Sequence, residues 1–169
     1  KVKNNYTYTH RLNKMLKIIF GLEDNKKLNL ACGVSPKPGY INHEIRQFAA
    51  YIDRCWDLEK NWETKEIYGE IVAEDIIEHL HDTVFFMNEC WNHLEAGGKL
   101  IIRTPSDKAP FAWTDLTHVR TFTIDSMDML DPTTNYGKCN NHITPYKWKI
   151  ISKIETENKN LEFILEKII

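Results

Sequence analysis

The chain has 169 residues, of which 42% are hydrophobic and 27% are charged, and its formal net charge at pH 7 is −2. These values are typical of one globular domain, and they give no general attraction to nucleic acid. No apolar run reaches the roughly 18 residues of a membrane span, and the four cysteines form no CxxC pair. The composition therefore predicts a reduced, cytoplasmic protein that has no structural zinc site.

Residues 1–26 form the first predicted unit, and residues 27–169 form the second. Within the first, the apolar side chains of residues 9–22 recur at the spacing of an amphipathic helix, and Gly21 is a stop signal. The basic residues of this region are typical of a solvated helix face followed by a polar turn; they are Arg11, Lys14, Lys17, Lys26 and Lys27.

Five short apolar runs in the second unit predict strands, and each ends at a glycine, a proline or a polar residue. They cover residues 27–32, 40–45, 51–56, 70–73 and 99–103. A crossover between parallel strands usually needs a helix, but only a loop rich in proline and glycine separates the first two runs. The first crossover helix is therefore predicted to be missing.

The 3.6-residue period from Asp75 to Leu94 predicts a long helix that stops at Gly97 and Gly98. A second helix is predicted from Thr123, its N-cap, to Leu130. Residues 148–155 and 161–168 alternate apolar and polar side chains, which predicts a β-hairpin. Strands that alternate with helices and end in a hairpin indicate an α/β fold with a mostly parallel sheet and an antiparallel edge.

Three of the loops after the strands carry residues suited to a nucleoside, because ligands bind at the carboxyl ends of the strands in such sheets. Gly33 would let a ligand approach the backbone, and Glu44 could accept hydrogen bonds from ribose hydroxyls. Asp57 could accept the amino group of adenine. Each acid taken alone is equally well explained as a solvent-exposed side chain.

The order of these motifs resembles class I S-adenosylmethionine-dependent methyltransferases of the compact, type-11-like family. The chain reads LNLACG, PGYINHE, EHL, LEAGGKL and DLTHVRTFT, where the family has LNLGCG, GYINVD, EHL, LKPGGxL and DPTHVRxFT. The resemblance covers roughly residues 27–130 and implies a single Rossmann-like domain that binds S-adenosylmethionine. By resemblance, the cofactor-binding residues follow the first four strands: Leu30, Ala31, Cys32, Gly33, Glu44, Asp57, Leu58, Ala73, Glu74 and Asp75.

Two residues depart from the family pattern. Ala31 stands where the family commonly has glycine, and Glu44 stands where it commonly has aspartate. Alanine adds one methyl group and tolerates ordinary φ values, and glutamate keeps the charge with a longer reach. These departures leave the expected binding site in place, although the affinity for the cofactor is open.

The DLTHVRTFT stretch follows the fifth strand and, by resemblance, faces the methyl acceptor. We expect His118 to act as general base toward an acceptor hydroxyl, with Asp115, Glu78 and His79 beside it. The alternative is that His118 only fixes the loop backbone through a hydrogen bond. Arg120 would suit an anionic group on the substrate.

Asp75, Glu78 and His79 occupy positions i, i+3 and i+4, so they would share one face of a helix, and His118 could complete a site for Mg²⁺ or Mn²⁺. The pattern is similar to that of the enzymes that methylate the 3′-terminal 2′-hydroxyl of small RNAs. A structural role for these residues is the favoured alternative, because magnesium prefers oxygen to imidazole ligands.

The sequence therefore predicts a methyltransferase that acts on a hydroxyl of a sugar or glycan, a small metabolite or an RNA. It contains no Asn/Asp-Pro-Pro-Tyr/Phe tetrapeptide and no Pro-Cys dipeptide, which argues against methylation of DNA bases. One alternative is a catalytically silent binding or assembly subunit that has lost cofactor affinity, which the replacement of the family's glycine by Ala31 would favour. Another is a nicotinamide-dependent oxidoreductase, which needs a glycine-rich turn entering a helix, whereas Gly33 enters a loop that contains prolines. No membrane partner is expected, and the oligomeric state is left open.

Overall fold

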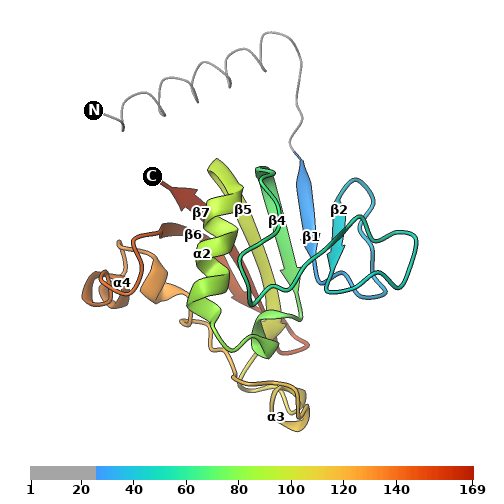
Figure 1. Ribbon diagram of the computed structural model, residues 1–169. Coiled ribbons are helices and arrows are strands. Elements are labelled where there is room, and N and C mark those ends of the chain that lie inside the picture. The colour runs from blue at the N-terminus through green and yellow to red at the C-terminus, as the bar shows by residue number, and fades with distance from the viewer. Residues whose placement is uncertain (1–25) are drawn as a thin grey trace, which may run out of the picture.

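The computed structural model describes residues 26–169 as one seven-stranded sheet with the order β3-β2-β1-β4-β5-β7-β6 (Figure 1). The helix expected over residues 9–22 lies outside the described residues. The strands are β1 (Lys27–Leu30), β2 (Ile41–Glu44), β3 (Arg54–Cys55), β4 (Tyr68–Glu74), β5 (Leu94–Pro105), β6 (Lys147–Glu155) and β7 (Asn160–Ile168). The first five are parallel, and β7 runs antiparallel to both β5 and β6. The predicted α/β fold with a C-terminal hairpin is confirmed.

No helix connects β1 to β2, as predicted, and the loop of residues 31–40 lies over β1 and β4 instead. Asn29 Nδ2 donates to Asn42 Oδ1 at 3.0 Å, and that oxygen also accepts the Lys37 amide at 2.8 Å. The Lys37 ammonium lies 3.0 Å from a carboxylate oxygen of Glu74. The loop therefore takes the place of the missing crossover helix.

The sheet face under this loop carries charged side chains, which explain why no helix needs to cover this face. Neighbouring residues across β1, β4, β5, β7 and β6 alternate in sign along one row, in the order Lys27, Glu70, Lys99, Glu166 and Lys149. Parallel sheets are normally covered by helices on both faces, and their strands are then apolar throughout. Here the alternating row makes one face compatible with water.

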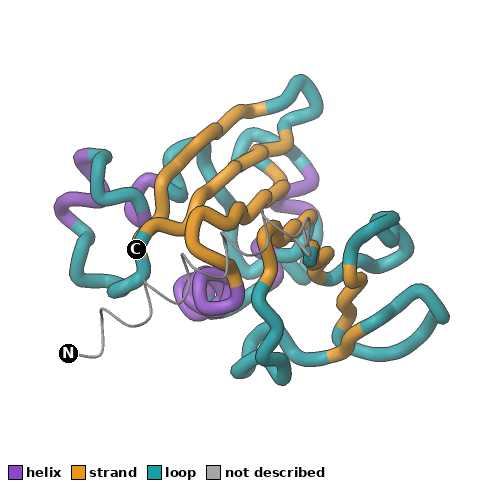
Figure 2. The backbone as a smooth tube through the Cα atoms, turned by 90° about the horizontal axis from the view of Figure 1, so that it is seen from above, coloured by secondary structure: helices purple, strands orange, loops and turns teal. Residues whose placement is uncertain are grey.

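Helix α2 (Thr83–His93) covers the opposite, apolar face, and Figure 2 shows it end-on along the sheet. It buries Phe86, Met87 and Cys90 in a core that includes Leu100 and Phe163. Burial of this apolar face stabilises the fold by about 25 cal/mol per Å² of apolar surface.

The prediction of one helix from Asp75 to Leu94 was wrong. The 3₁₀ turn η1 (Ile77–His79) comes first, Leu80 is extended, and α2 then starts afresh because Asp82 Oδ1 accepts the Phe85 amide at 2.8 Å. The helix ends at His93 with Leu94 as its C-cap, within one residue of the predicted end, but the predicted stop signal was wrong. Gly97 and Gly98 lie inside β5 rather than after the helix.

The helix predicted from Thr123 to Leu130 was also wrong. Ser126 Oγ accepts the Thr123 amide, so the segment forms turns that end in the 3₁₀ turn η2 (Asp128–Leu130). Two short helices that the sequence did not indicate, α3 (Phe111–Thr114) and α4 (Asn135–Cys139), flank it. The four cysteines are free. Within residues 26–169, no helix is long and apolar enough to cross a membrane.

Lys167 on β7 is buried, and its ammonium donates to the Leu94 carbonyl at 2.7 Å and lies 3.8 Å from the centre of the Trp91 ring. Burial lowers the pKa of Lys167 from 10.5 to about 8. Between pH 8 and pH 10.5 the Lys167 side chain is protonated in the unfolded chain but has lost its proton in the folded protein. The free energy of unfolding should therefore rise with pH across this range. We expect Lys167→Met to remove the rise and to stabilise the protein at pH 7 by about 1–2 kcal/mol, because no charge is then buried.

Urea unfolding at pH 7, 8, 9 and 10 checks this expectation. Lys149→Met, at an exposed position of β6, is the matched control and should keep the rise. An unchanged pH dependence in Lys167→Met would contradict the assignment to Lys167.

Candidate active site

The carboxyl ends of β1, β2, β4 and β5 meet at one end of the sheet, the lower end in Figure 1. The predicted cofactor residues follow the first four strands, and the predicted acceptor residues lie in η1 and in the loop around α3. Both sets are thus at the end where ligands bind in parallel sheets.

Glu44 and Gly33 are brought together. Glu44 Oε1 accepts the Gly33 amide at 3.1 Å, and Oε2 accepts the Ile45 amide at 2.9 Å. Gly33 has φ +51°, and a side chain built there would meet nothing within 4 Å, so the backbone beside the carboxylate is open to a ligand. The Tyr51 hydroxyl donates to the Gly33 carbonyl at 2.9 Å and fixes the loop from its other side.

His43, which the sequence analysis missed, anchors this loop from below. Its Nδ1 accepts the Ala31 amide at 3.3 Å, and its Nε2 donates to the Trp56 carbonyl at 3.1 Å. Burial lowers the pKa of His43 to about 4, so the ring is neutral at pH 7 and can make both contacts. A buried histidine within a short strand gives no pattern that reveals this role.

Ala31 has φ +47°, whereas the sequence analysis expected an ordinary φ at this position. The left-handed conformation costs a residue with a side chain about 1–2 kcal/mol. The loop thus requires at position 31 a positive φ, which glycine adopts without strain. We expect Ala31→Gly to raise the free energy of unfolding by about 0.5–1 kcal/mol, part of the relief being offset by the greater freedom of glycine in the unfolded chain.

Chemical denaturation of Ala31→Gly measures this gain, and Ala49→Gly, which has no positive φ, is its control. Ala49→Gly should be neutral or destabilising. Equal effects of the two substitutions would show that the strain at Ala31 is unimportant.

The carboxylate of Asp57 contacts its own turn instead of the Glu44–Gly33 pair. It accepts the Glu59 amide at 3.0 Å and lies 3.1 Å from the Lys60 ammonium, and these contacts lower the pKa of Asp57. Leu58 is buried beside it in the core.

The other cofactor candidates lie within the sheet or at its edge. Leu30 and Ala73 are buried in β1 and β4, and Cys32 is buried just after β1. Glu74 binds Lys37, and the Asp75 carboxylate forms an ion pair with Arg103. Asp75 lines the same cavity as Glu78, His79 and His118, but its carboxylate pairs with Arg103 and is not grouped with their ligand atoms.

The other three predicted metal ligands do converge. Glu78, His79 and His118 each place a potential ligand atom so that the three atoms lie within 4.8 Å of one another. The two imidazole rings are edge-to-face with their centres 4.7 Å apart. Thr104 Oγ1 donates to the buried Glu78 carboxylate at 2.9 Å, and burial raises the pKa of Glu78.

Hydrogen bonds define the proton positions on both histidines. Thr117 Oγ1 donates its only proton to Asp115 Oδ1 at 2.6 Å, so it can only accept from His79 Nδ1, 3.0 Å away. His118 Nδ1 contacts the Ala112 carbonyl at 3.1 Å and must be its donor. Each Nε2 therefore carries a lone pair, free to accept a proton or to bind a metal.

Asp115 supports the His118 ring. Its Oδ2 lies 3.8 Å from His118 Nε2, close enough to stabilise an imidazolium, while the Thr117 amide and hydroxyl fix its Oδ1 and lower the pKa of Asp115. The arrangement places the His118 imidazole beside a carboxylate that would stabilise its protonated form.

A cavity of about 570 Å³ opens onto these residues. Its lining combines the predicted residues with others that the sequence analysis missed: Pro105, Phe111, Thr114 and Asn160. Asn160 begins β7, and only the pairing of the hairpin with β5 brings it here. No spacing along the chain could have indicated that.

Comparison with known proteins identifies the fold. No protein-family model matches the chain, and a search of curated proteins gives no match. The solved structure of the N-methyltransferase NodS from Bradyrhizobium japonicum WM9 matches with a TM-score of 0.53 at 12% identity, covering 98% of this chain and 99% of that one. An S-adenosylmethionine-dependent methyltransferase from Clostridium acetobutylicum ATCC 824 gives 0.56 at 12% identity, covering 97% and 99%. The [4+2]-cyclase SpnF gives 0.60 at 9% identity, covering 95% and 81%.

The chain therefore has the Rossmann-like fold of class I S-adenosylmethionine-dependent methyltransferases. At these identities the likeness establishes the fold alone, and the cyclase among the matches is a reminder that one fold can support different reactions.

Proposed function

We propose that the protein is an S-adenosylmethionine-dependent methyltransferase whose acceptor is a hydroxyl group. The observation that carries the proposal is the pairing of Glu44 with the open Gly33 backbone, at the same end of the sheet as a cavity that contains the histidine His118. The structure of NodS with S-adenosyl-L-homocysteine, whose fold this chain shares, supports the choice of cofactor.

Gly33 and Glu44 fit the nucleoside part of this cofactor. The open backbone at Gly33 admits a ligand, and the carboxylate beside it can exchange an amide contact for ribose hydroxyls. The Asp57 carboxylate would accept the amino group of adenine once its ion pair with Lys60 is broken. The cofactor supplies a methyl group on a sulfonium, which leaves as a neutral thioether.

The acceptor would bind in the cavity at His118. Its hydroxyl oxygen forms the new bond to the methyl carbon, the carbon–sulfur bond breaks with its electron pair on sulfur, and the hydroxyl proton passes to His118 Nε2. Asp115 stabilises the resulting imidazolium. Most of the remaining acceleration comes from alignment of the reacting atoms. Whether the hydroxyl belongs to a sugar, a small metabolite or an RNA is decided by what fits between Phe111 and Asn160.

The triad Glu78, His79 and His118 also suits a divalent metal. Both Nε2 lone pairs are free while each Nδ1–H is held by an oxygen atom of the protein, which is the usual second contact of a metal-bound histidine. Two imidazoles and one carboxylate favour zinc, iron or manganese over magnesium. A bound ion would occupy the lone pair of His118 Nε2, so this role is an alternative to His118 as general base, and the ion would instead lower the pKa of the acceptor hydroxyl. Activity that disappears with a chelator and returns with Mn²⁺ would support this role, and full activity in excess chelator would exclude it.

A nicotinamide-dependent oxidoreductase is not favoured. Dinucleotides bind where the first strand turns into a helix whose N-terminus holds the pyrophosphate, and the loop after β1 contains no helix. A silent subunit remains the competing proposal, because Ala31 is strained where a functional loop would have glycine.

Calorimetric titration with S-adenosylhomocysteine separates the enzyme from the silent subunit. We expect micromolar binding that Glu44→Gln weakens at least tenfold, since the charge that accepts both ribose hydroxyls is lost. Glu63→Gln, at an exposed position away from the sheet end, should bind as the native chain does. No detectable heat at millimolar ligand would favour the silent subunit.

A further inference from the structure

The cavity at His118 has an acidic lining, and this limits which acceptors it can hold. Asp75, Glu78 and Asp115 each contribute a carboxylate to the lining, which contains no lysine or arginine among the described residues. The hydroxyl and the amide of Thr117 donate to Asp115 and lower the pKa of its carboxyl, so this group is ionised at pH 7. Because like charges in one site repel each other, the lining disfavours an anionic ligand.

Two arginines lie close in the chain to lining residues, and both already have partners. The Arg103 guanidinium forms an ion pair with Asp75, which offsets one of the three negative charges. Arg120 lines a separate cavity of about 710 Å³, where one of its guanidinium nitrogens donates to the His81 carbonyl at 2.6 Å. The anionic substrate group that the sequence suggested for Arg120 therefore finds no arginine in the cavity at His118.

The polar groups of the lining are mostly hydrogen-bond acceptors. The Nε2 atoms of His79 and His118 each carry a lone pair, and the carboxylates add further acceptor oxygens. Asn160 and Thr114 supply donors, from an amide and a hydroxyl. A hydroxyl group donates one proton and accepts through two lone pairs, so a ligand with several hydroxyls can use both kinds of group at once. The lining therefore matches an uncharged polyhydroxyl compound.

An exposed aromatic surface adjoins these polar groups. Phe111 lines the cavity and is 43% exposed, and Trp113, on the same short helix α3, is 68% exposed. The Trp113 indole N–H donates to the Asp107 carbonyl at 2.7 Å, which fixes the ring although it is not packed in the core. Exposed aromatic rings beside a cavity are typical of ligand sites. The C–H groups of a sugar ring carry a slight positive charge and pack on the negative face of such rings.

We propose that the methyl acceptor is an uncharged sugar residue, one that carries no phosphate or carboxylate group. Its hydroxyls would contact His118, Glu78 and Asn160, and its C–H face would pack on Phe111. The inference rests on the proposed function, because it names the acceptor of the same site. It disfavours RNA, since every ribose hydroxyl of RNA lies within a few bonds of a phosphate, and phosphate binding depends on lysine and arginine.

Saturation-transfer NMR on the full chain, without cofactor, tests the proposal. The neutral probes are the methyl glycosides of glucose, galactose, mannose, rhamnose and xylose, and the anionic probes are glucose 6-phosphate, glucuronate and the dinucleotide UpU. Titrations are run in EDTA and again with equimolar Zn²⁺, since a metal bound at Glu78, His79 and His118 would change the charge of the cavity. We expect at least one glycoside to bind about tenfold more tightly than every anionic probe in both buffers.

Two variants with matched controls locate the binding. Phe111→Ala should weaken glycoside binding about fivefold, whereas Tyr136→Ala, at an exposed position that lines the other cavity, should leave it unchanged. Asp75→Asn leaves the Arg103 guanidinium without its ion pair and should narrow the preference over the anionic probes severalfold. Glu63→Gln, at an exposed position, should keep the native preference. Thermal unfolding of each variant shows that it is folded.

The proposal is overturned if no glycoside binds at tens of millimolar, if an anionic probe binds as tightly as the best glycoside in either buffer, or if either Phe111→Ala or Asp75→Asn behaves as the native chain does. Calorimetry with S-adenosylhomocysteine tests the proposed function separately. Cofactor binding without glycoside binding would reject the acceptor class alone, and glycoside binding without cofactor binding would reject the methyltransferase.

Discussion

Replacement of His118 by alanine is expected to lower kcat/KM for methyl transfer by about 10²- to 10⁴-fold, the usual contribution of a positioned general base. The cavity holds two free imidazole nitrogens, and His118 Nε2 is the one beside Asp115, which can stabilise the protonated ring. Formation of S-adenosylhomocysteine from a pool of sugars, small RNAs and metabolites measures the loss. The effect should be on kcat, because the cofactor residues are untouched.

His142→Ala is the matched control, since His142 is exposed and does not line the cavity at His118. It should retain native activity. If His118→Ala turned over at the native rate while remaining folded, His118 would only fix the loop through Ala112, which is the structural role considered from the sequence.

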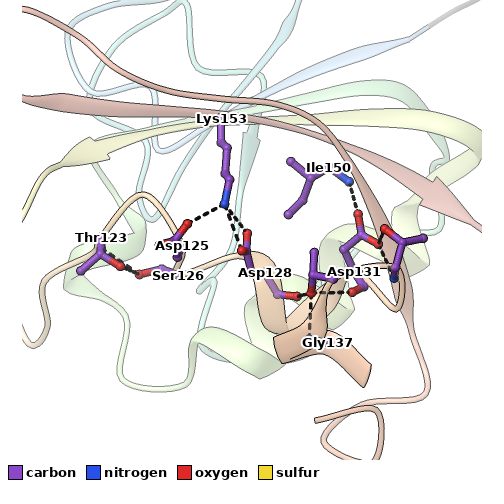
Figure 3. A network of polar contacts seen from close by, with 10 residues as sticks. Thr123, Asp125, Ser126, Asp128, Asp131, Gly137, Ile150 and Lys153 are labelled. Carbon is purple, nitrogen blue, oxygen red and sulfur yellow. Dashed lines mark hydrogen bonds and ion pairs between the residues drawn. The ribbon is translucent and has the colours of Figure 1, made fainter. Parts of the chain in front are cut away.

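Gly137→Ala is expected to destabilise the protein by about 3 kcal/mol, a value typical of a severe backbone clash in a packed region. A Cβ at Gly137 would lie 1.8 Å from the Asp131 carbonyl oxygen and 2.9 Å from that of Asp128. Thr134 caps α4 by accepting the Gly137 amide and also donates to the Asp128 carbonyl. A shift of Gly137 would therefore disturb the network of polar contacts shown in Figure 3. Urea unfolding gives the change in the free energy of unfolding.

Lys138→Ala changes the next residue of α4, which is exposed, and should alter the stability by less than about 0.5 kcal/mol. If Gly137→Ala were as stable as Lys138→Ala, the close contact with Asp131 would not exist.

The hydrophobic patterns predicted most of the strands, because the alternation in β7 and the apolar runs of β1 and β4 record burial directly. Of the strand predicted over residues 51–56, only Arg54 and Cys55 form β3, and both are exposed. The patterns failed where local side-chain hydrogen bonds compete with the helix. Asp82 starts α2 later than the period suggests, and Ser126 turns the expected second helix into a series of turns. Such contacts leave no periodic signature.

In the candidate site, groupings that follow from spacing along the chain were predictable, whereas contacts between residues on different strands were not. The pairing of Glu44 with Gly33 and the grouping of Glu78 with His79 follow from strand order and spacing. The contact of Asp75 with Arg103, by contrast, depends on the register between β4 and β5. Because register is a property of the folded sheet, no motif could have shown it.

A crystal structure of the protein with S-adenosylhomocysteine tests the central claim most directly. We expect the nucleoside to lie across the ends of β1, β2 and β3, with its ribose on Glu44 beside Gly33 and its sulfur toward the cavity at His118. Electron density for the nucleoside elsewhere on the molecule, with Glu44 still holding both of its amides, would contradict the account.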